Sequence, residues 1–262
     1  GAEAVSARAA SLLLGATAAG FLLSALLPWS ALATIVGGDP KLGLAILLEL
    51  RLPRALLALI YGATLGASGA AIQALFANPL ASPDLTGTTS GAALGAVVTA
   101  YLVELSAPLA LSGGAVVGAL GALGLLLALA GPRAETSTLL LAGLAISALA
   151  GALTTLALAL APSPFAFYDA YDRLMGSLVD RSLGQALFAL VPALVSIILL
   201  LRLVPALDSL ALGEESAQAM GYDIRRTRLW VVALSALGVG GCVAICGAIG
   251  FVGLVAPIFA RR

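Results

Sequence analysis

Histidine is absent from this chain of 262 residues, cysteine occurs only twice, and charged residues make up only 10%. The lack of histidine removes the commonest general base and the commonest metal ligand. Both cysteines, Cys242 and Cys246, lie in an apolar run, which excludes a disulfide framework. Their i, i+4 spacing is that of metal ligands, but no histidine or nearby carboxylate completes the set. We interpret them as small buried hydrophobes and expect neither a metal site nor a cofactor.

Two further absences limit the function. The sequence has no GxxxxGK(S/T) loop, so it is not expected to be an enzyme that hydrolyses ATP itself, and such energy would have to come from a partner. The 13 basic and 13 acidic residues give a net charge of zero, which provides no indication of nucleic-acid binding.

Long apolar runs, in contrast, dominate the chain. Hydrophobic residues make up 61% and the mean hydropathy is +1.11, whereas a soluble domain carries roughly 25% charged residues. A helix needs about 20 apolar residues to cross a bilayer. Seven uncharged runs meet this need: 9–28, 55–77, 85–103, 105–131, 136–161, 182–201 and 229–260. The sequence therefore predicts an all-α polytopic transmembrane bundle, one domain over residues 1–262, in the lipid bilayer of the cell (inner) membrane.

The connections between these runs carry most of the charge. The substantial ones are 29–54, 162–181 and 202–228, and the second contains YDAYDRLMGS, which indicates a short surface helix. Lysine and arginine counts on alternate sides favour the side of the 202–228 segment as cytoplasmic. The last apolar run is longer than one span needs. Its glycines at 247, 250 and 253 predict a bend or a break, with a second crossing that begins near Phe251.

Small and polar residues within the spans indicate helix packing. Tyr61 and Gln73 are polar groups inside one span, and either a place along a translocation path or an interhelical hydrogen bond accounts for them. Glycines four residues apart lie on one helix face, where a neighbouring helix packs closely. Three such pairs are present: Gly62 with Gly66, Gly91 with Gly95, and Gly114 with Gly118.

The 202–228 segment contains signals for helices outside the membrane. Gly213 precedes Glu214 and Glu215, and acidic residues in a first turn favour the positive end of the helix dipole. Gly221 is placed where a helix ends in a left-handed cap. Asp223 is predicted to cap a second short helix carrying three arginines. These arginines are Arg225, Arg226 and Arg228. Two short helices with a tight turn form a rigid projection that can dock a partner, and a solvated loop with ordinary caps is the alternative.

Two arginines, Arg51 and Arg54, flank Pro53 at the mouth of the second predicted span. A pair of guanidinium groups at a membrane surface is suited to bidentate recognition of carboxylates. Arginines near span ends also reach toward lipid headgroups, so simple anchoring is the alternative.

Short polar breaks separate two other spans. Asn78, Pro79 and Leu80 end the second predicted span, and Thr136 and Ser137 open the fifth. Ordinary turn chemistry explains Asn-Pro and Thr-Ser at helix ends, so these residues indicate a site only with further support.

Three stretches of the sequence resemble one family. They are RLPRALLALIYGATLGASGAAIQALFANPLASPDLTGTTSGA at 51–92, STLLLAGLAISAL at 137–149 with LMGSL at 174–178, and LGEESAQAMGYDIRRTRL at 212–229 continuing into GAIGFVGLVAP at 247–257. In these residues the chain resembles the FecCD-like permeases of ATP-binding-cassette importers, which carry iron chelates, haem or cobalamin inward. The resemblance implies a type II importer permease fold of about ten spans. The sequence is therefore expected to end before the last three.

The resemblance also implies roles for the residues above. Four residues of the 202–228 segment would contact the ATPase: Glu214, Glu215, Ala217 and Gly221. Two arginines would receive glutamates of the periplasmic substrate-binding protein: Arg51 and Arg54. Four residues would form a cytoplasmic gate with their copies in a second subunit: Asn78, Leu80, Thr136 and Ser137. The family's histidine after Pro257 is missing here, so axial capture of haem iron by this chain is not expected.

The sequence thus predicts the permease subunit of an ATP-driven importer. It would pass an iron chelate, haem or cobalamin from a periplasmic binding protein to the cytoplasm by alternating access. Its expected partners are cassette ATPase subunits, the binding protein and a second permease copy in a homodimer. An ion-coupled secondary transporter is the first alternative, although such proteins usually place ionisable residues in their spans. A scaffold that only assembles a complex is the second.

Overall fold

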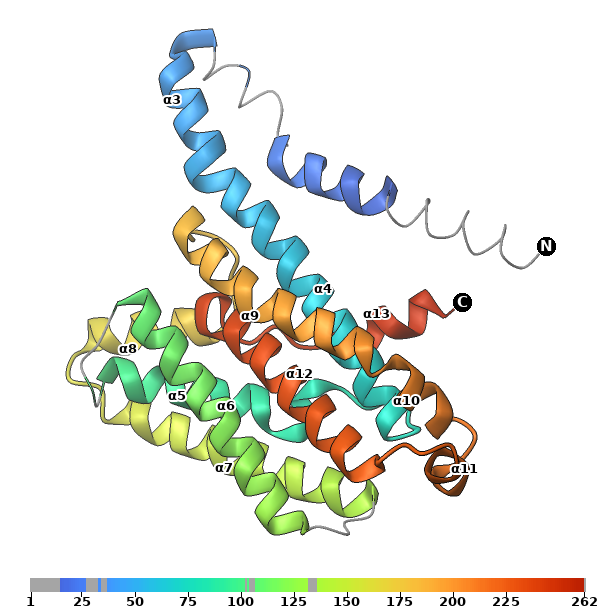
Figure 1. The fold of residues 1–262 in the computed structure, drawn as a ribbon. Coiled ribbons are helices and arrows are strands. Elements are labelled where there is room, and N and C mark those ends of the chain that lie inside the picture. Colours follow the sequence, from blue (N-terminus) through green and yellow to red (C-terminus); the bar gives the residue numbers. More distant parts are fainter. Residues whose placement is uncertain are drawn as a thin grey trace. The chain divides into compact units, whose positions relative to one another are not determined.

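The computed structural model describes residues 15–26, 33, 37–101, 103, 107–131 and 136–261, and in these residues all regular structure is helical. This confirms the predicted all-α fold (Figure 1). The chain forms two compact units, one made of Gly1–Ile60 with Leu178–Leu187 and the other of Tyr61–Ser177 with Phe188–Arg262. That residues 1–262 act as a single transmembrane domain stays a prediction.

In chain order the labelled elements are α3 (Pro40–Ala45), the π-helix η1 (Ile46–Arg51), α4 (Leu52–Leu75), the 3-10 helix η2 (Pro83–Thr86), α5 (Thr88–Tyr101), α6 (Pro108–Ala130), α7 (Thr136–Ala159), α8 (Pro164–Leu174), α9 (Leu183–Arg202), α10 (Val204–Leu210), α11 (Glu214–Ala219), α12 (Ile224–Cys246) and α13 (Val252–Ala260).

Five helices are long and apolar enough to cross a membrane, and they correspond to five of the seven predicted spans. They are Pro40–Leu75, Ala110–Leu129, Ser137–Ala159, Leu183–Arg202 and Ile224–Cys246. The run 85–103 forms α5, whose 14 residues extend only about 21 Å at the α-helical rise. The run 9–28 contains the helix Gly15–Leu26, and its other residues lie outside the described part of the chain. Crossing by these last two runs stays a prediction.

The second span begins earlier than the apolar run predicted, because Asp39 caps a helix within the expected connection. Its side chain accepts hydrogen bonds from the backbone N–H groups of Lys41 (3.0 Å) and Leu42 (3.3 Å). Pro40, at the first helical position, has a backbone already suited to a helix start. The π-turn η1 then carries the helix directly into α4.

Glycine contacts pack α5 against α6 in the second unit, where α5, α6 and α7 lie side by side (Figure 1). A Cβ atom on Gly95 would overlap the carbonyl oxygen of Gly114, and one on Gly118 would overlap that of Gly91. The two predicted glycine pairs therefore face each other and let the backbones touch.

The third pair behaves differently. A Cβ atom on Gly62 would meet nothing within 4 Å, and one on Gly66 would only reach Ala256 at 3.9 Å. The close approach on α4 occurs instead at Gly69, against the carbonyl of Gly253. The spacing of the pair identified the helix that packs closely but missed the glycine that makes the contact.

Two polar side chains of α4 form hydrogen bonds to the chain at the predicted break between α12 and α13 and in the first turn of α13. Gly247 ends α12 with a φ of +75°. The Tyr61 hydroxyl donates to the Gly247 carbonyl (3.0 Å) and accepts from the Ile249 N–H (3.3 Å). Nε2 of Gln73 donates to the Leu254 carbonyl (3.0 Å). Backbone groups freed within a membrane need such partners, and these contacts support the interhelical interpretation of both polar residues.

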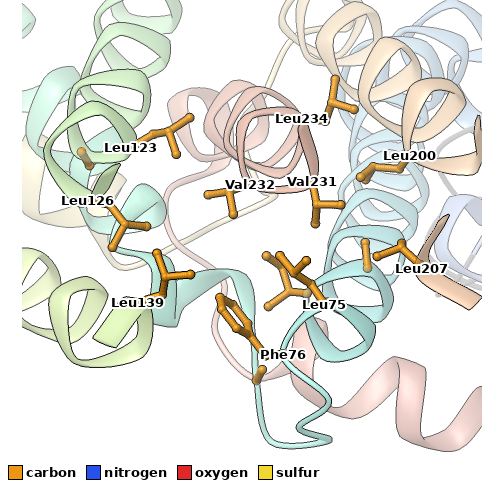
Figure 2. Close-up of a cluster of buried hydrophobic side chains, with 14 of the residues drawn as sticks. Leu75, Phe76, Leu123, Leu126, Leu139, Leu200, Leu207, Val231, Val232 and Leu234 are labelled. Carbon is orange, nitrogen blue, oxygen red and sulfur yellow. The ribbon is translucent and has the colours of Figure 1, made fainter. Parts of the chain in front are cut away.

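A buried hydrophobic cluster joins the helix ends on one side of the second unit (Figure 2). Its larger members come from the end of α4 and the residue after it (Leu75, Phe76), α6 (Leu126), the start of α7 (Leu139), the end of α9 (Leu200), the middle of α10 (Leu207) and the first turns of α12 (Val231, Val232). Because the cluster links these ends, a displacement of one is resisted by packing against the others.

Candidate docking and gate sites

The 202–228 segment folds into two short helices, α10 and α11, before α12 begins. α10 was not predicted from the sequence, although Pro205 in its first turn is a start signal. α11 follows Gly213, and Glu214 and Glu215 occupy its first turn with exposed side chains, as predicted. Ala217 is fully buried, so its methyl group packs inside the segment rather than on its surface.

Gly221 ends α11 in the left-handed conformation that was predicted, with a φ of +90°. Its N–H donates to the Gln218 carbonyl (2.9 Å), and the N–H of Tyr222 donates to the Ala217 carbonyl (3.1 Å). This pair of bonds is the Schellman motif. A Cβ atom on Gly221 would meet nothing within 4 Å. Within this chain the glycine is therefore required by its backbone conformation, and the space beside it is open.

Asp223 caps the long helix α12 and not a second short helix, which corrects the prediction. Its Oδ1 accepts from the backbone N–H of Arg226 (3.1 Å), and Oδ2 pairs with the guanidinium of the same arginine (3.2 Å). No glycine or proline interrupts residues 224–237, so the helical turn that carries the three arginines continues directly into the apolar span. Arg228 forms an ion pair with Glu214, which joins α11 to α12.

Arg51 and Arg54 lie three residues apart at the junction of η1 and α4. Nη1 of Arg51 donates to the Leu26 carbonyl (3.0 Å), so part of this half-buried guanidinium is held by the chain itself. Arg54 is exposed and makes no ion pair with a described residue. Of the two, Arg54 offers the freer guanidinium, and the docking role of both stays a prediction.

The turn after α4 has the chemistry of a capped helix end. Ala77 has a φ of +45°, and the N–H of Asn78 donates to the Gln73 carbonyl (3.1 Å). Oδ1 of Asn78 accepts from the Leu80 N–H (2.9 Å), which fixes a compact turn. The side chain of Leu80 is 66% exposed, so this turn presents a leucine to its surroundings.

The second gate segment begins at Thr136, the first residue of α7, and its Ser137 side chain is exposed. Leu139, one turn further, shares the buried cluster with Phe76, which follows α4 (Figure 2). The structure therefore brings the two predicted gate segments to the same end of the second unit. Closure of a pore by these segments stays a prediction.

Among the residues that the structure describes, no three His, Cys, Asp or Glu side chains group closely enough to hold a metal ion. Cys242 and Cys246 lie within α12 without a disulfide to a described residue, and both are fully buried.

These features define a polytopic helical membrane protein. Its helices are apolar and long enough to cross a membrane, and a buried tyrosine forms hydrogen bonds to the backbone of the break between α12 and α13. Residues 10–262 match the model of the FecCD transport family, and the chain belongs to that family. This confirms the resemblance stated from the sequence and, with the five apolar helices, the multi-pass location in the cell membrane.

Named relatives agree with this family. A vitamin B12 import system permease protein of Vibrio cholerae serotype O1 is 40% identical over 81% of this chain and 64% of its own length. A probable siderophore transport system permease protein of Bacillus subtilis is 36% identical, over 95% and 76% of the two chains. A cobalamin import system permease protein of Halobacterium salinarum is 35% identical, over 88% and 64%. The chain therefore spans less than two thirds of two of these relatives.

A solved structure has the same fold. It is an ABC transporter described as of the metal-chelate type, in an inward-facing conformation. The TM-score is 0.82, the sequence identity is 29%, and the match covers 96% of this chain and 81% of the solved chain. This likeness confirms the transporter-permease fold.

Proposed function

We propose that this chain belongs to the permease subunit of an ATP-driven importer that carries a metal chelate of the cobalamin or siderophore class. The names of the relatives support the cargo class, and the 202–228 segment supports the source of energy. The protein would work by alternating access, with ATP hydrolysed by a cassette ATPase and the chelate delivered by a periplasmic binding protein.

The ion pair between Glu214 and Arg228 is the observation that carries this proposal. It fastens the exposed helix α11 to the first turns of α12. A few residues further along, Val231 and Val232 belong to the buried cluster that contains Leu139. A force applied to α11 would therefore reach the end of the bundle where the gate segments lie. A solvated loop without such attachments would not transmit it.

Exposed apolar side chains on the same segment favour a protein partner. Leu212 is 70% exposed and Met220 is 51% exposed, and they stand at the two ends of α11. Methionine is enriched in interface cores, and exposed carboxylates at their rim add selectivity. We assign Glu214, Glu215 and Gly221 to the contact surface for the ATPase. Ala217 would support that surface from within, because a larger side chain at this buried position would push α11 outward.

The other contacts follow the family arrangement. Arg54, supported by Arg51, would receive a carboxylate of the binding protein, because an exposed guanidinium binds such a group bidentately. Asn78 with Leu80, and Thr136 with Ser137, would close the pore against the same residues of a second permease copy. Small polar and apolar groups suit a gate that seals without retaining a large solute.

Co-purification of the full-length permease with its cassette ATPase tests the docking assignment. Gly221→Arg places a long charged side chain in the open space beside the cap, and we expect loss of the ATPase from the purified complex. Gly221→Asn is the matched control, because asparagine tolerates the left-handed conformation and adds little volume. Recovery of the ATPase with the arginine variant at the native level would refute the assignment. Loss with both variants, despite native thermal stability of the permease, would show that the glycine is needed for more than approach of the partner.

A further inference from the structure

A cavity of about 240 Å³ lies beside the start of α12 in the second unit, and the docking and gate contacts proposed above do not occupy it. Its walls come from the ends of α4 and α6, the start of α7 and the first turns of α12. Figure 2 shows four of its apolar residues, Leu75, Leu126, Leu139 and Val232, with their side chains directed toward one another. Arg225 and Arg228 complete the lining, and we call it the Arg225–Arg228 cavity.

The charges that the structure describes in the lining of this cavity are positive. Among the lining residues that the structure describes, the two charged ones are arginines and none is acidic. Arg225 is exposed and makes no ion pair with a described residue. Arg228 is paired with Glu214, which does not line the cavity. Among the described residues, the guanidinium of Arg225 thus lines a leucine-walled space without a counter-ion, an arrangement that favours an anionic ligand with an apolar part.

The position of the cavity along α12 corresponds to the lipid headgroup region. The arginines lie where the apolar span begins, and Leu229 is the first of the apolar residues that follow. Trp230 is next in the chain and is 55% exposed. Exposed tryptophans at span ends lie at the level of the headgroups. The arginines would thus lie at the depth of lipid phosphates, and the leucines at the depth of the first carbons of the acyl chains.

The volume excludes a whole solute. Pockets that enclose a drug-sized ligand measure about 300–1,000 Å³, and chelates of the cobalamin class are larger than such ligands. A cavity of about 240 Å³ holds only part of a molecule whose remainder lies elsewhere. A phospholipid meets this condition, because the rest of its chains stay in the bilayer.

We infer that the Arg225–Arg228 cavity binds an anionic phospholipid, with the phosphate between the two guanidinium groups and the upper part of one chain against the leucines. Basic pockets between transmembrane helices on the cytoplasmic side are suited to such headgroups. Only the choice of the inner leaflet rests on the proposed function, which places the 202–228 segment in the cytoplasm. The binding site itself does not depend on an ATPase partner.

The lipid would share Arg228 with Glu214, so binding at the cavity and the ion pair between α11 and α12 compete. Removal of the Glu214 charge removes this competitor of the phosphate for Arg228. We therefore expect Glu214→Gln to bind anionic lipid more tightly than the native protein, whereas Arg225→Gln binds it more weakly. A general surface effect would give the same two signs, because Glu214→Gln raises the net charge and Arg225→Gln lowers it. The two explanations are therefore separated by a variant outside the cavity that changes the net charge in the same way.

The experiment is a titration of the purified full-length permease, without ATPase, with phosphatidylglycerol in detergent, followed by native mass spectrometry. Arg225→Gln should weaken binding about fivefold, the value expected for one arginine near an anionic headgroup. Arg225→Lys should retain most of the binding, which also shows that the site is intact. Arg226→Gln is the matched control, because Arg226 is the next residue, is exposed, pairs with Asp223 and does not line the cavity.

Three results would overturn the inference. Equal loss in Arg225→Gln and Arg226→Gln would reduce the effect to surface charge. Equal binding of phosphatidylcholine would show that the arginines do not select the headgroup. Displacement of phosphatidylglycerol by millimolar inorganic phosphate, with phosphate bound alone as tightly, would identify a site for soluble anions. Because no ATPase is present in this titration, its failure is distinguishable from a failure of the docking assignment.

Discussion

Replacement of Tyr61 by phenylalanine removes one oxygen atom and, with it, both hydrogen bonds that α4 makes to the break after α12. Tyr61 is 1% exposed, so water has little access to the site. The carbonyl of Gly247 loses its donor, and the N–H of Ile249 loses its acceptor. The ring itself stays in place, because phenylalanine keeps the same shape.

The expected cost follows from the surroundings of these two groups. A buried polar group left without its partner costs about 1–3 kcal/mol in soluble proteins. Interhelical hydrogen bonds in membranes are weaker, about 0.6 kcal/mol on average and about 1.7 at most. Gly247 is buried but Ile249 is only half-buried, so the N–H of Ile249 is less enclosed than the carbonyl of Gly247 and loses less when the hydroxyl is removed. We therefore expect Tyr61→Phe to lower the free energy of unfolding by about 1–2 kcal/mol.

Reversible unfolding of the full-length permease in mixed micelles measures this difference. Tyr171→Phe is the matched control, because Tyr171 is 45% exposed and its ring stacks on Phe167 at 5.9 Å, a contact that phenylalanine keeps. If both variants unfold with the same free energy, to within about 0.3 kcal/mol, the Tyr61 hydroxyl does not stabilise the break.

Two further predictions concern packing and docking. Gly95→Ala should destabilise the bundle by about 1–3 kcal/mol through overpacking, because the new Cβ would overlap the Gly114 carbonyl. In the control Gly113→Ala the new Cβ meets nothing within 4 Å, so this variant should be neutral. Equal unfolding free energies for the two variants would contradict the α5–α6 contact. Arg54→Glu should weaken binding of the periplasmic protein about tenfold or more through like-charge repulsion. In the control Lys41→Glu, at another exposed position, the affinity should change little. Binding of native strength by the Arg54 variant at physiological salt would show that this arginine only anchors the chain at the membrane surface.

Local chemistry made parts of this structure predictable. The left-handed cap at Gly221 and the acidic first turn of α11 depend on neighbours within a few residues, and both were predicted from that pattern. The break after α12 was predicted in the same way, because Gly247 lies at the end of an apolar run too long for one span. Such features need no knowledge of distant contacts.

Features that depend on distant residues were missed. The ion pair of Glu214 with Arg228 joins residues 14 positions apart and has no signal in either neighbourhood. The Arg225–Arg228 cavity requires the ends of four helices to meet, which hydrophobic periodicity does not specify. Asp223 was assigned to a short helix because the arginines after it suggested a solvated element, yet the uninterrupted helix continues into the span. The roles of Arg54 and of the gate residues depend on partners that a single chain does not contain.

Uptake into proteoliposomes tests the central claim most directly. The full-length permease would be reconstituted with its cassette ATPase and supplied with the binding protein loaded with a labelled chelate. We predict uptake that requires ATP on the ATPase side, persists when an uncoupler removes ion gradients, and is lost with Gly221→Arg. Uptake driven by an ion gradient without ATP, and unchanged in the Gly221→Arg variant, would contradict it.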